Sequence, residues 1–563
     1  MRVVGVMLAA LVALAIMVVS VWGTNVVHPS AEDHPERALI CLALVAVFLA
    51  VPWTAGIRRK LGIWIFDSRP GRFEGFIFLV AVVWYSVLSF ELFQGIPHLD
   101  DSVASLFQAR VFLSGNITLP VPEHPEFFRV FGVLAAEAGL DHQVGMYPPG
   151  WPLLLAIGQA VGIPWIVNPI LGGLLAVFTG RLARELFSED VGRVAAILCL
   201  CSPFLGILHA THLSHTATAL GGVIAWWAGI RMVRTGKFRW GVIAGLTLAI
   251  AFLCRPLTAA VCGGCLGLGL LFFVKPVELL RSWKPILAAV ILVLGAVGAQ
   301  LAFNKASTGD ALTAGHVKGL GRRGKMGFVK LDHVRTHTVE LGVEYSRRRL
   351  VATNQTLNGW PLPAMMLALI PLAFGPRRWR AVWLLLPMTG LILLFATFWY
   401  WEEYYPGRYV SEAMPYILVL AAAGWGFLRD RWAESKLAPR IIPGTWVVGG
   451  IIFALACSNN DLYDYYRPQH GDVENILPQV VDTYGITNAL VMTDSVETRF
   501  HWDGDQYNNY YATGFQRNTL TMDGDVVYAW NIPRDKSSDK ATLSKRRQAL
   551  FEAYKGRSYY LPI

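Results

Sequence analysis

The chain has 563 residues, of which 54% are hydrophobic and only 16% are charged, and its mean hydropathy is +0.44. Soluble domains carry about a quarter charged residues, so this composition excludes an ordinary soluble protein and predicts a polytopic membrane protein. The net charge of +10 does not call for a nucleic-acid partner, because Lys and Arg gather at the cytoplasmic ends of membrane helices during insertion.

Basic clusters separate the apolar runs, and they lie at 56–72, 180–186, 231–239, 377–380 and 429–436. Because cytoplasmic loops are enriched in Lys and Arg, we expect these clusters inside the cell, with the N-terminus inside and the C-terminus outside. The apolar runs between them predict about thirteen transmembrane helices, at 3–22, 38–57, 74–94, 164–181, 193–210, 215–233, 240–255, 257–274, 285–303, 360–376, 381–399, 411–428 and 441–458. Arg255 and Pro256 interrupt the run 240–274, which leaves its division into two helices open.

Three polar segments then lie on the outer side, at 95–150, 304–359 and 459–563. The second holds ten Lys and Arg, against the usual charge bias, although a loop of this length can still be translocated. We therefore expect a transmembrane domain over 1–458, including the first two outer segments, and a small extracytoplasmic α/β domain over 459–563.

The tail has the composition of an α/β domain. The runs "NALVMTDS" and "DVVYAWNI" are apolar and rich in β-forming residues, so each predicts a strand. The later stretch "SKRRQALFEAYKGR" has the pattern of an amphipathic helix.

Two adjacent carboxylates, Asp100 and Asp101, follow the third predicted helix closely. One interpretation is structural, because an Asp before "SVASLFQARVFL" is a good helix N-cap and acids favour a helix start. That helix would lie along the membrane surface, with Val103, Leu106 and Phe107 on its apolar side. The next stretch, "MYPPGWPLLLAIGQAVGIPW", predicts a short interfacial helix that cannot span a bilayer.

Together these elements resemble the first outer loop of the GT-C superfamily of membrane glycosyltransferases. The resemblance rests on "HLDD" at 98–101, the following helix and "YPP" at 147–149. It continues in "FLCRPLTA", "FNKASTGDALTAG" and "YYPGRYVSEAMPYIL" and covers roughly 74–430. The chain is similar to the branch that contains protein O-mannosyltransferases and lipid A aminoarabinose transferases, which is glycosyltransferase family 39-like.

The resemblance implies an inverting sugar transfer from a polyprenyl-phosphate-linked donor to an acceptor on the outer face of the membrane. In such enzymes an outer-loop Asp is the general base on the acceptor hydroxyl, and Asp100 matches it. Asp101 stands where this branch commonly has Glu, and its expected role is orientation. The implied partners are the lipid-linked donor, an envelope glycan, lipid or protein acceptor and membrane lipids, and the implied location is a bacterial inner membrane.

The leaving phosphate gains negative charge in the transition state and needs fixed cations. Arg255 interrupts a membrane run and Arg408 lies at an outer helix mouth, so both are candidates, although the related aminoarabinose transferases are expected to use a lysine. The structural alternatives are snorkelling for Arg255 and a surface salt bridge for Arg408, with Glu402, Glu403 or Glu412 as its partner.

Further substrate-binding candidates are aromatic or imidazole side chains near the outer helix ends, namely His98, Tyr147, His212, His215 and Tyr409. Imidazole and carboxylate groups also suit a divalent metal, which stays open as an alternative, but no cofactor is required by the sequence. The seven cysteines all fall in apolar runs and predict neither disulfides nor a metal site.

Two other functions compete with sugar transfer. A transporter or flippase of lipid-linked glycans would also have many helices and buried arginines, but it more often shows paired inverted halves, and none is visible here. A membrane scaffold with a wall-binding tail would leave the acid pair and Arg255 unexplained.

Overall fold

The computed structural model describes residue 60 and residues 63–358, 364–375, 378–402, 405–433, 466, 473, 475–493, 513–531 and 540–560. The predicted helices at 3–22, 38–57 and 441–458 lie outside these residues. Every other predicted membrane helix has a helical counterpart, which confirms a mostly helical, multi-pass chain.

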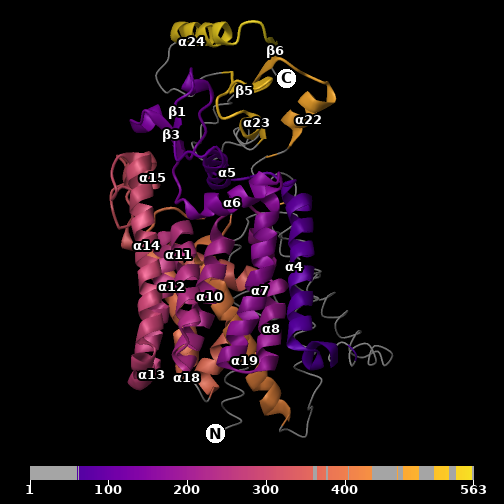
Figure 1. Ribbon diagram of the computed structural model, residues 1–563, viewed down its shortest axis with the longest axis vertical. Helices are drawn as coiled ribbons and strands as arrows, with labels where there is room; N and C mark the ends of the chain where they lie inside the picture. The colour runs from indigo at the N-terminus through magenta and orange to yellow at the C-terminus, as the bar shows by residue number, and fades with distance from the viewer. Residues whose placement is uncertain are drawn as a thin grey trace.

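The described helices of the bundle mostly run along the long axis of the molecule (Figure 1). They are α4 (Pro70–Phe93), α7 (Val167–Leu186), α8 (Glu189–Leu200), α9 (Pro203–Ala210), α10 (His215–Thr235), α11 (Phe238–Cys254), α12 (Pro256–Phe273), α14 (Trp283–Thr308), α17 (Ala364–Phe374), α18 (Arg378–Ala396) and α19 (Met414–Ala433). In the described part of the chain, six helices are long and apolar enough to cross a membrane, or seven if α8 and α9 form one span.

Two prolines divide predicted runs into separate helices. The single helix expected over 193–210 is wrong, because α8 and α9 meet at an angle of 60°. Pro203 starts α9, where its missing N–H costs nothing, and the Ser202 hydroxyl accepts from the Leu205 N–H. Pro256 likewise starts α12, so the interruption expected in 240–274 is present and Arg255 lies between two helices.

Small residues let α11 and α14 approach closely. A Cβ at Gly241 would lie 2.1 Å from the Pro285 carbonyl oxygen, and one at Gly245 would lie 2.6 Å from Ala289 Cα. Neither contact is sterically allowed, so only glycine permits this packing. Close backbone approach through small residues is a common way to join helices in a membrane, where no hydrophobic effect drives them together.

The predicted cytoplasmic clusters meet at one end of the bundle. Arg181 pairs with Glu74 at 2.6 Å, which joins the ends of α7 and α4. Arg234 pairs with Glu185 at 2.5 Å, and Arg429 of α19 pairs with Asp190 at 2.6 Å. Figure 1 shows the outer segments at the opposite end, with α5 and α6 above the bundle. Ion-paired basic clusters therefore lie at one end of the bundle, and the polar outer segments lie at the other.

The first outer segment contains two helices and a small sheet. They are α5 (Asp100–Leu113), α6 (Gly150–Ala160), β1 (Leu119–Pro120), β2 (Val133–Leu134) and β3 (His142–Gly145), with antiparallel strand order β1-β3-β2. The predicted N-cap is wrong, because Leu99 occupies that position and both Asp100 and Asp101 are already helical. Most residues of α5 are buried against other parts of the protein, and its expected place along the membrane surface stays a prediction.

The second outer segment begins with α15 (Gly315–Leu320) and η4 (Gly321–Gly324) and ends with α16 (Val339–Thr356). It packs against the first, since a Cβ at Gly315 would lie 2.5 Å from the Met146 carbonyl oxygen. On the opposite side of the bundle, the short helix α13 (Pro276–Arg281) connects α12 and α14.

The tail contains a parallel sheet of β4 (Ala489–Thr493), β5 (Val526–Trp530) and β6 (Ser558–Tyr560), in the order β5-β4-β6. β4 and β5 lie where the sequence predicts strands, and α24 (Lys540–Ala553) overlaps the predicted amphipathic helix. α22 (Ile476–Thr483) and α23 (Phe515–Arg517) are the other described helices of this region.

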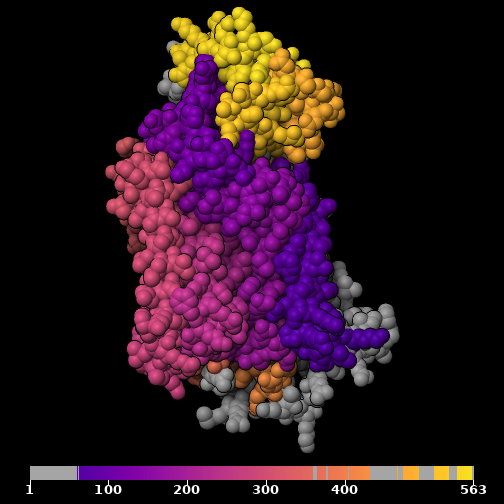
Figure 2. Space-filling model, viewed as in Figure 1, coloured from indigo at the N-terminus to yellow at the C-terminus, as the bar shows by residue number. Residues whose placement is uncertain are grey.

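The tail shares one hydrophobic core with the first outer segment. Val103, Phe107 and Val111 of α5 are buried against tail residues such as Val527 and Trp530. Figure 2 shows the orange and yellow tail resting on the indigo and purple atoms of that segment. The tail sheet thus holds the helix that carries the acid pair.

Arg110 links α5 to the tail. Its guanidinium donates to the carbonyl oxygens of Gln516, at 3.0 Å, and of Asn518. We expect Arg110→Leu to raise amide hydrogen exchange over 513–531 by about tenfold or more, because buried carbonyls lose a charged donor. Arg517→Leu is the control, since among the described residues Arg517 pairs with Asp482 alone and that pair is exposed. Equal exchange in both variants would contradict this role for Arg110.

Candidate active site

The first turn of α5 presents the acid pair to the connection between β3 and α6. The Tyr147 hydroxyl donates to Asp101 Oδ1 at 2.5 Å. Burial raises the pKa of Tyr147 well above its usual value, and the neighbouring Asp101 carboxylate raises it further, so the phenol keeps its proton. Gly150 presses this connection onto the end of α11, because a Cβ there would lie 2.6 Å from the Leu253 carbonyl carbon.

Arg408 approaches the acid pair from the other side. It begins η5 (Arg408–Ala413) after Gly407, whose φ of +89° favours glycine. Its Nη2 lies 3.9 Å from Asp101 Oδ2, and only 7% of the residue is exposed. The surface salt bridge considered for Arg408 is therefore wrong: the residue is buried and its ion pair in the described chain is with Asp101. Glu403 lies outside the described residues.

Arg255 belongs to a second buried group. Its Nε lies 2.9 Å from Glu412 Oε1, and His215 Nδ1 lies 2.9 Å from the same oxygen. Arg255 Nη1 also reaches the Ser214 hydroxyl at 3.5 Å. The guanidinium is held inside the protein by these groups, which overturns the snorkelling interpretation.

Tyr409 lies among three arginines. The guanidinium carbon of Arg408 is 5.1 Å from the centre of its ring, and those of Arg255 and Arg349 are each 5.8 Å away. Phe395 stacks on the ring at 4.7 Å. An aromatic face attracts cations, so Tyr409 helps three positive groups to lie near one another.

Arg349 and Glu402 form the buried ion pair that sequence reasoning missed. Both side chains are 0% exposed, and Arg349 Nε lies 2.9 Å and 3.0 Å from the two carboxylate oxygens of Glu402. Glu402 Oε1 also accepts the Tyr409 N–H at 3.3 Å, so the pair supports the backbone of η5. Burial raises the pKa of Glu402, whereas Arg349 opposes that rise. In the sequence, the feature that points to this ion pair is the run of three arginines at 347–349.

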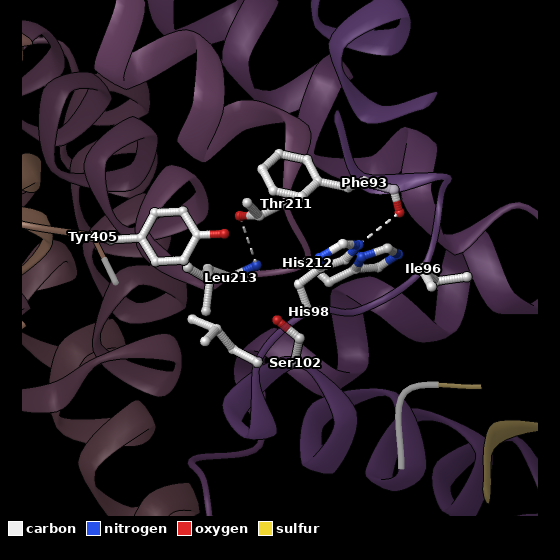
Figure 3. Close-up of a pocket in the computed structure, with 9 residues that line it drawn as sticks. Phe93, Ile96, His98, Ser102, Thr211, His212, Leu213 and Tyr405 are labelled. Atoms are coloured by element: carbon white, nitrogen blue, oxygen red, sulfur yellow. Dashed lines mark hydrogen bonds between the residues drawn. The ribbon is translucent and has the colours of Figure 1, made fainter. Parts of the chain in front are cut away.

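His98 and His212 line a neighbouring small hollow (Figure 3). His98 Nε2 is 3.0 Å from the Phe93 carbonyl oxygen. Neither ring nitrogen of His212 has a hydrogen-bond partner among the described residues, and burial lowers the pKa of this imidazole to about 3. His212 is therefore neutral and supplies no positive charge to an anion.

The structure thus brings together Asp101, Tyr147, Arg408 and Tyr409, with Asp100 in the same helical turn. His215 joins Arg255 beside them, whereas His98 and His212 face the separate hollow. Among the described residues, no three His, Cys, Asp or Glu side chains are grouped so that they could hold a metal ion.

Comparison with protein families gives a match over residues 152–300 to the dolichyl-phosphate-mannose-protein mannosyltransferase family. No curated protein sequence matches the chain. Two solved structures of ArnT from Cupriavidus metallidurans share its fold. The apo state has a TM-score of 0.51 and 10% identity over 86% of this chain and 88% of that one. The state bound to undecaprenyl phosphate has a TM-score of 0.52 and 11% identity over 86% and 89%.

An oligosaccharyltransferase from Archaeoglobus fulgidus, in complex with Zn and sulfate, has a TM-score of 0.45 and 14% identity over 77% of this chain and 63% of that one. At identities this low, the ArnT likeness shows the fold alone. The family match covers a quarter of the chain, from α6 to α14. Family match and shared fold agree with the motifs in the sequence, and the predicted resemblance to the GT-C superfamily of membrane glycosyltransferases is confirmed.

Proposed function

We propose that this chain transfers a sugar from a polyprenyl-phosphate-linked donor to an acceptor at the extracytoplasmic face of the inner membrane, with inversion at the anomeric carbon. The observation that carries the proposal is the approach of Asp101 to Arg408, at 3.9 Å, at the outer end of a membrane bundle. Asp100 lies in the same helical turn as Asp101, so a carboxylate base and a guanidinium lie close together there, and sugar transfer from a lipid phosphate needs both charges. ArnT from Cupriavidus metallidurans, which has a similar fold, binds undecaprenyl phosphate.

In this proposal Asp100 is the general base. Its carboxylate takes the proton of the acceptor hydroxyl as that oxygen attacks the anomeric carbon of the donor. The bond between that carbon and the phosphate oxygen breaks, and its electron pair leaves on the lipid phosphate. Asp101, held by Tyr147 and facing Arg408, orients the first turn of α5.

The arginines stabilise the leaving phosphate, and they do so unequally. Arg255 is already neutralised in part by Glu412, 2.9 Å away. Arg408 lies 3.9 Å from Asp101, which is longer than a hydrogen bond, so its donors remain able to reach an incoming phosphate. We therefore assign the larger share of phosphate binding to Arg408, with Arg255 and Tyr409 beside it. The acceptor is an envelope glycan, lipid or protein.

Undecaprenyl phosphate binding to the full chain, titrated by native mass spectrometry, tests this assignment. Arg408→Leu should weaken binding by about tenfold or more, as expected for the loss of a charged hydrogen bond. Arg408→Lys should keep part of the affinity, because an ammonium supplies the charge without the planar fork. Arg429→Leu is the control, since Arg429 pairs with Asp190 at the far end of the bundle. Unchanged affinity in Arg408→Leu would remove this residue from the phosphate site.

A further inference from the structure

The connection between α14 and α16 combines several cations that pair with no described residue with exposed apolar side chains. Residues 315–336 contain six Lys and Arg against a single acid, Asp332. Val334 is 91% exposed and Leu312, just after α14, is 84% exposed. Phe328 and Val329 are also exposed. Lys and Arg are usually enriched in cytoplasmic loops, so a translocated loop with this composition is unusual. A function on the outer side would explain why it carries so many cations.

This connection lies at the outer end of a membrane-spanning helix. The Gly327 N–H donates to the Thr397 carbonyl at 2.8 Å, and His337 Nε2 is 2.9 Å from the Ala396 carbonyl oxygen. The Trp399 indole donates to the Arg323 carbonyl at 2.6 Å. Since Ala396 is the last residue of α18, these bonds place the connection where lipid headgroups meet the protein.

A small turn projects from the connection at this level. Lys330 and Thr336 form an isolated bridge, and the Asp332 carboxylate accepts the N–H groups of Val334 and Arg335 at 2.9 Å and 2.7 Å. Asp332 also pairs with Arg323 at 2.6 Å. Asp332, the single acid, is thus occupied by contacts with Val334, Arg335 and Arg323. The exposed Val334 side chain lies at the tip of the turn.

The remaining cations of the connection form no ion pair with any described residue, and we name them the outer basic patch: Lys318, Arg322, Lys325, Lys330 and Arg335. We infer that the outer basic patch binds the headgroups of anionic phospholipids in the outer leaflet, while Val334 and Phe328 enter the interface beside them. Basic side chains flanking exposed apolar ones at a bilayer surface are the chemistry that recognises such headgroups. This inference does not depend on the proposed function.

Fluorescence at the tip of the turn tests this inference with the full chain in nanodiscs. Val334→Cys, labelled with an environment-sensitive nitrobenzoxadiazole dye, should show blue-shifted emission in discs that contain phosphatidylglycerol. The dye should also be quenched several-fold more by nitroxide lipids there than in pure phosphatidylcholine discs. Raising the salt concentration to about 0.5 M should remove most of the difference, because it shortens the reach of charges to a few ångströms.

Two variants and one control complete the experiment. Replacing the five residues of the outer basic patch by Gln should abolish the dependence on phosphatidylglycerol, and a matching thermal unfolding curve shows that this variant is folded. Tyr484→Cys is the control label, because Tyr484 is 77% exposed but lies on the tail. The parent chain treated with the same dye corrects for its own cysteines. Equal emission in both kinds of disc, or a response to soluble polyphosphate in place of the lipid, would overturn the inference.

Discussion

Asp100→Asn is expected to lower sugar transfer by about 10²–10⁴-fold, because an amide cannot accept the proton of the acceptor hydroxyl. The variant keeps the size of the side chain, and the hydrogen bond between Tyr147 and Asp101 does not involve Asp100. Transfer should be measured in proteoliposomes with labelled polyprenyl-phosphate sugar, next to a titration of undecaprenyl phosphate binding, which should stay near that of the parent.

Two further variants show whether the effect is specific to Asp100. Asp141→Asn is the control, since Asp141 lies in the same outer segment with a side chain that is 98% exposed. It should transfer sugar at the parental rate. Asp101→Asn removes the charge that faces Arg408 and should reduce both transfer and lipid binding, because it disturbs the position of that arginine. Full activity in Asp100→Asn, with loss only in Asp101→Asn, would assign the base to Asp101 instead.

The sequence predicts those parts of the fold that depend on local pattern. Apolar runs locate the described membrane helices, and Arg255 with Pro256 marks the division between α11 and α12. The apolar runs of the tail, rich in β-forming residues, locate β4 and β5. In each case the signal lies within a few residues of the feature, and the bilayer or the sheet requires it.

The sequence does not predict features that depend on contacts between distant residues. The sequence suggests Glu402 and Glu412 only as partners of Arg408, whereas in the structure they pair with Arg349 and Arg255. Arg349 is 53 positions from Glu402, and it stands in a row of three arginines that look alike in the sequence. Only packing shows that Arg347 faces solvent and that Arg349 faces the core. Likewise, the apolar faces of α5 and the tail could each have formed a separate core.

Arg349→Met is expected to lower the free energy of unfolding by about 3–5 kcal/mol, because it leaves the Glu402 carboxylate buried without a countercharge. Arg349 also donates to the Phe395 carbonyl at 2.8 Å and to the Tyr400 carbonyl at 3.1 Å, so two further acceptors lose their donor. Since Glu402 accepts the Tyr409 N–H, the variant should lose lipid binding as well. Thermal unfolding in detergent and the lipid titration measure both effects.

The neighbouring Arg347 supplies the control for this ion pair. It pairs with Glu344 on the same helix, its side chain is 54% exposed, and Arg347→Met should change neither stability nor lipid binding measurably. In the double variant Arg349→Met with Glu402→Gln both charges of this ion pair are removed, so neither is left buried without its partner and most of the stability should return. The amide oxygen of the new side chain can still accept the Tyr409 N–H, but the guanidinium beside the ring is gone. Lipid binding should therefore recover less than stability does. Equal recovery of both would mean that Arg349 acts on η5 only through the stability of the fold.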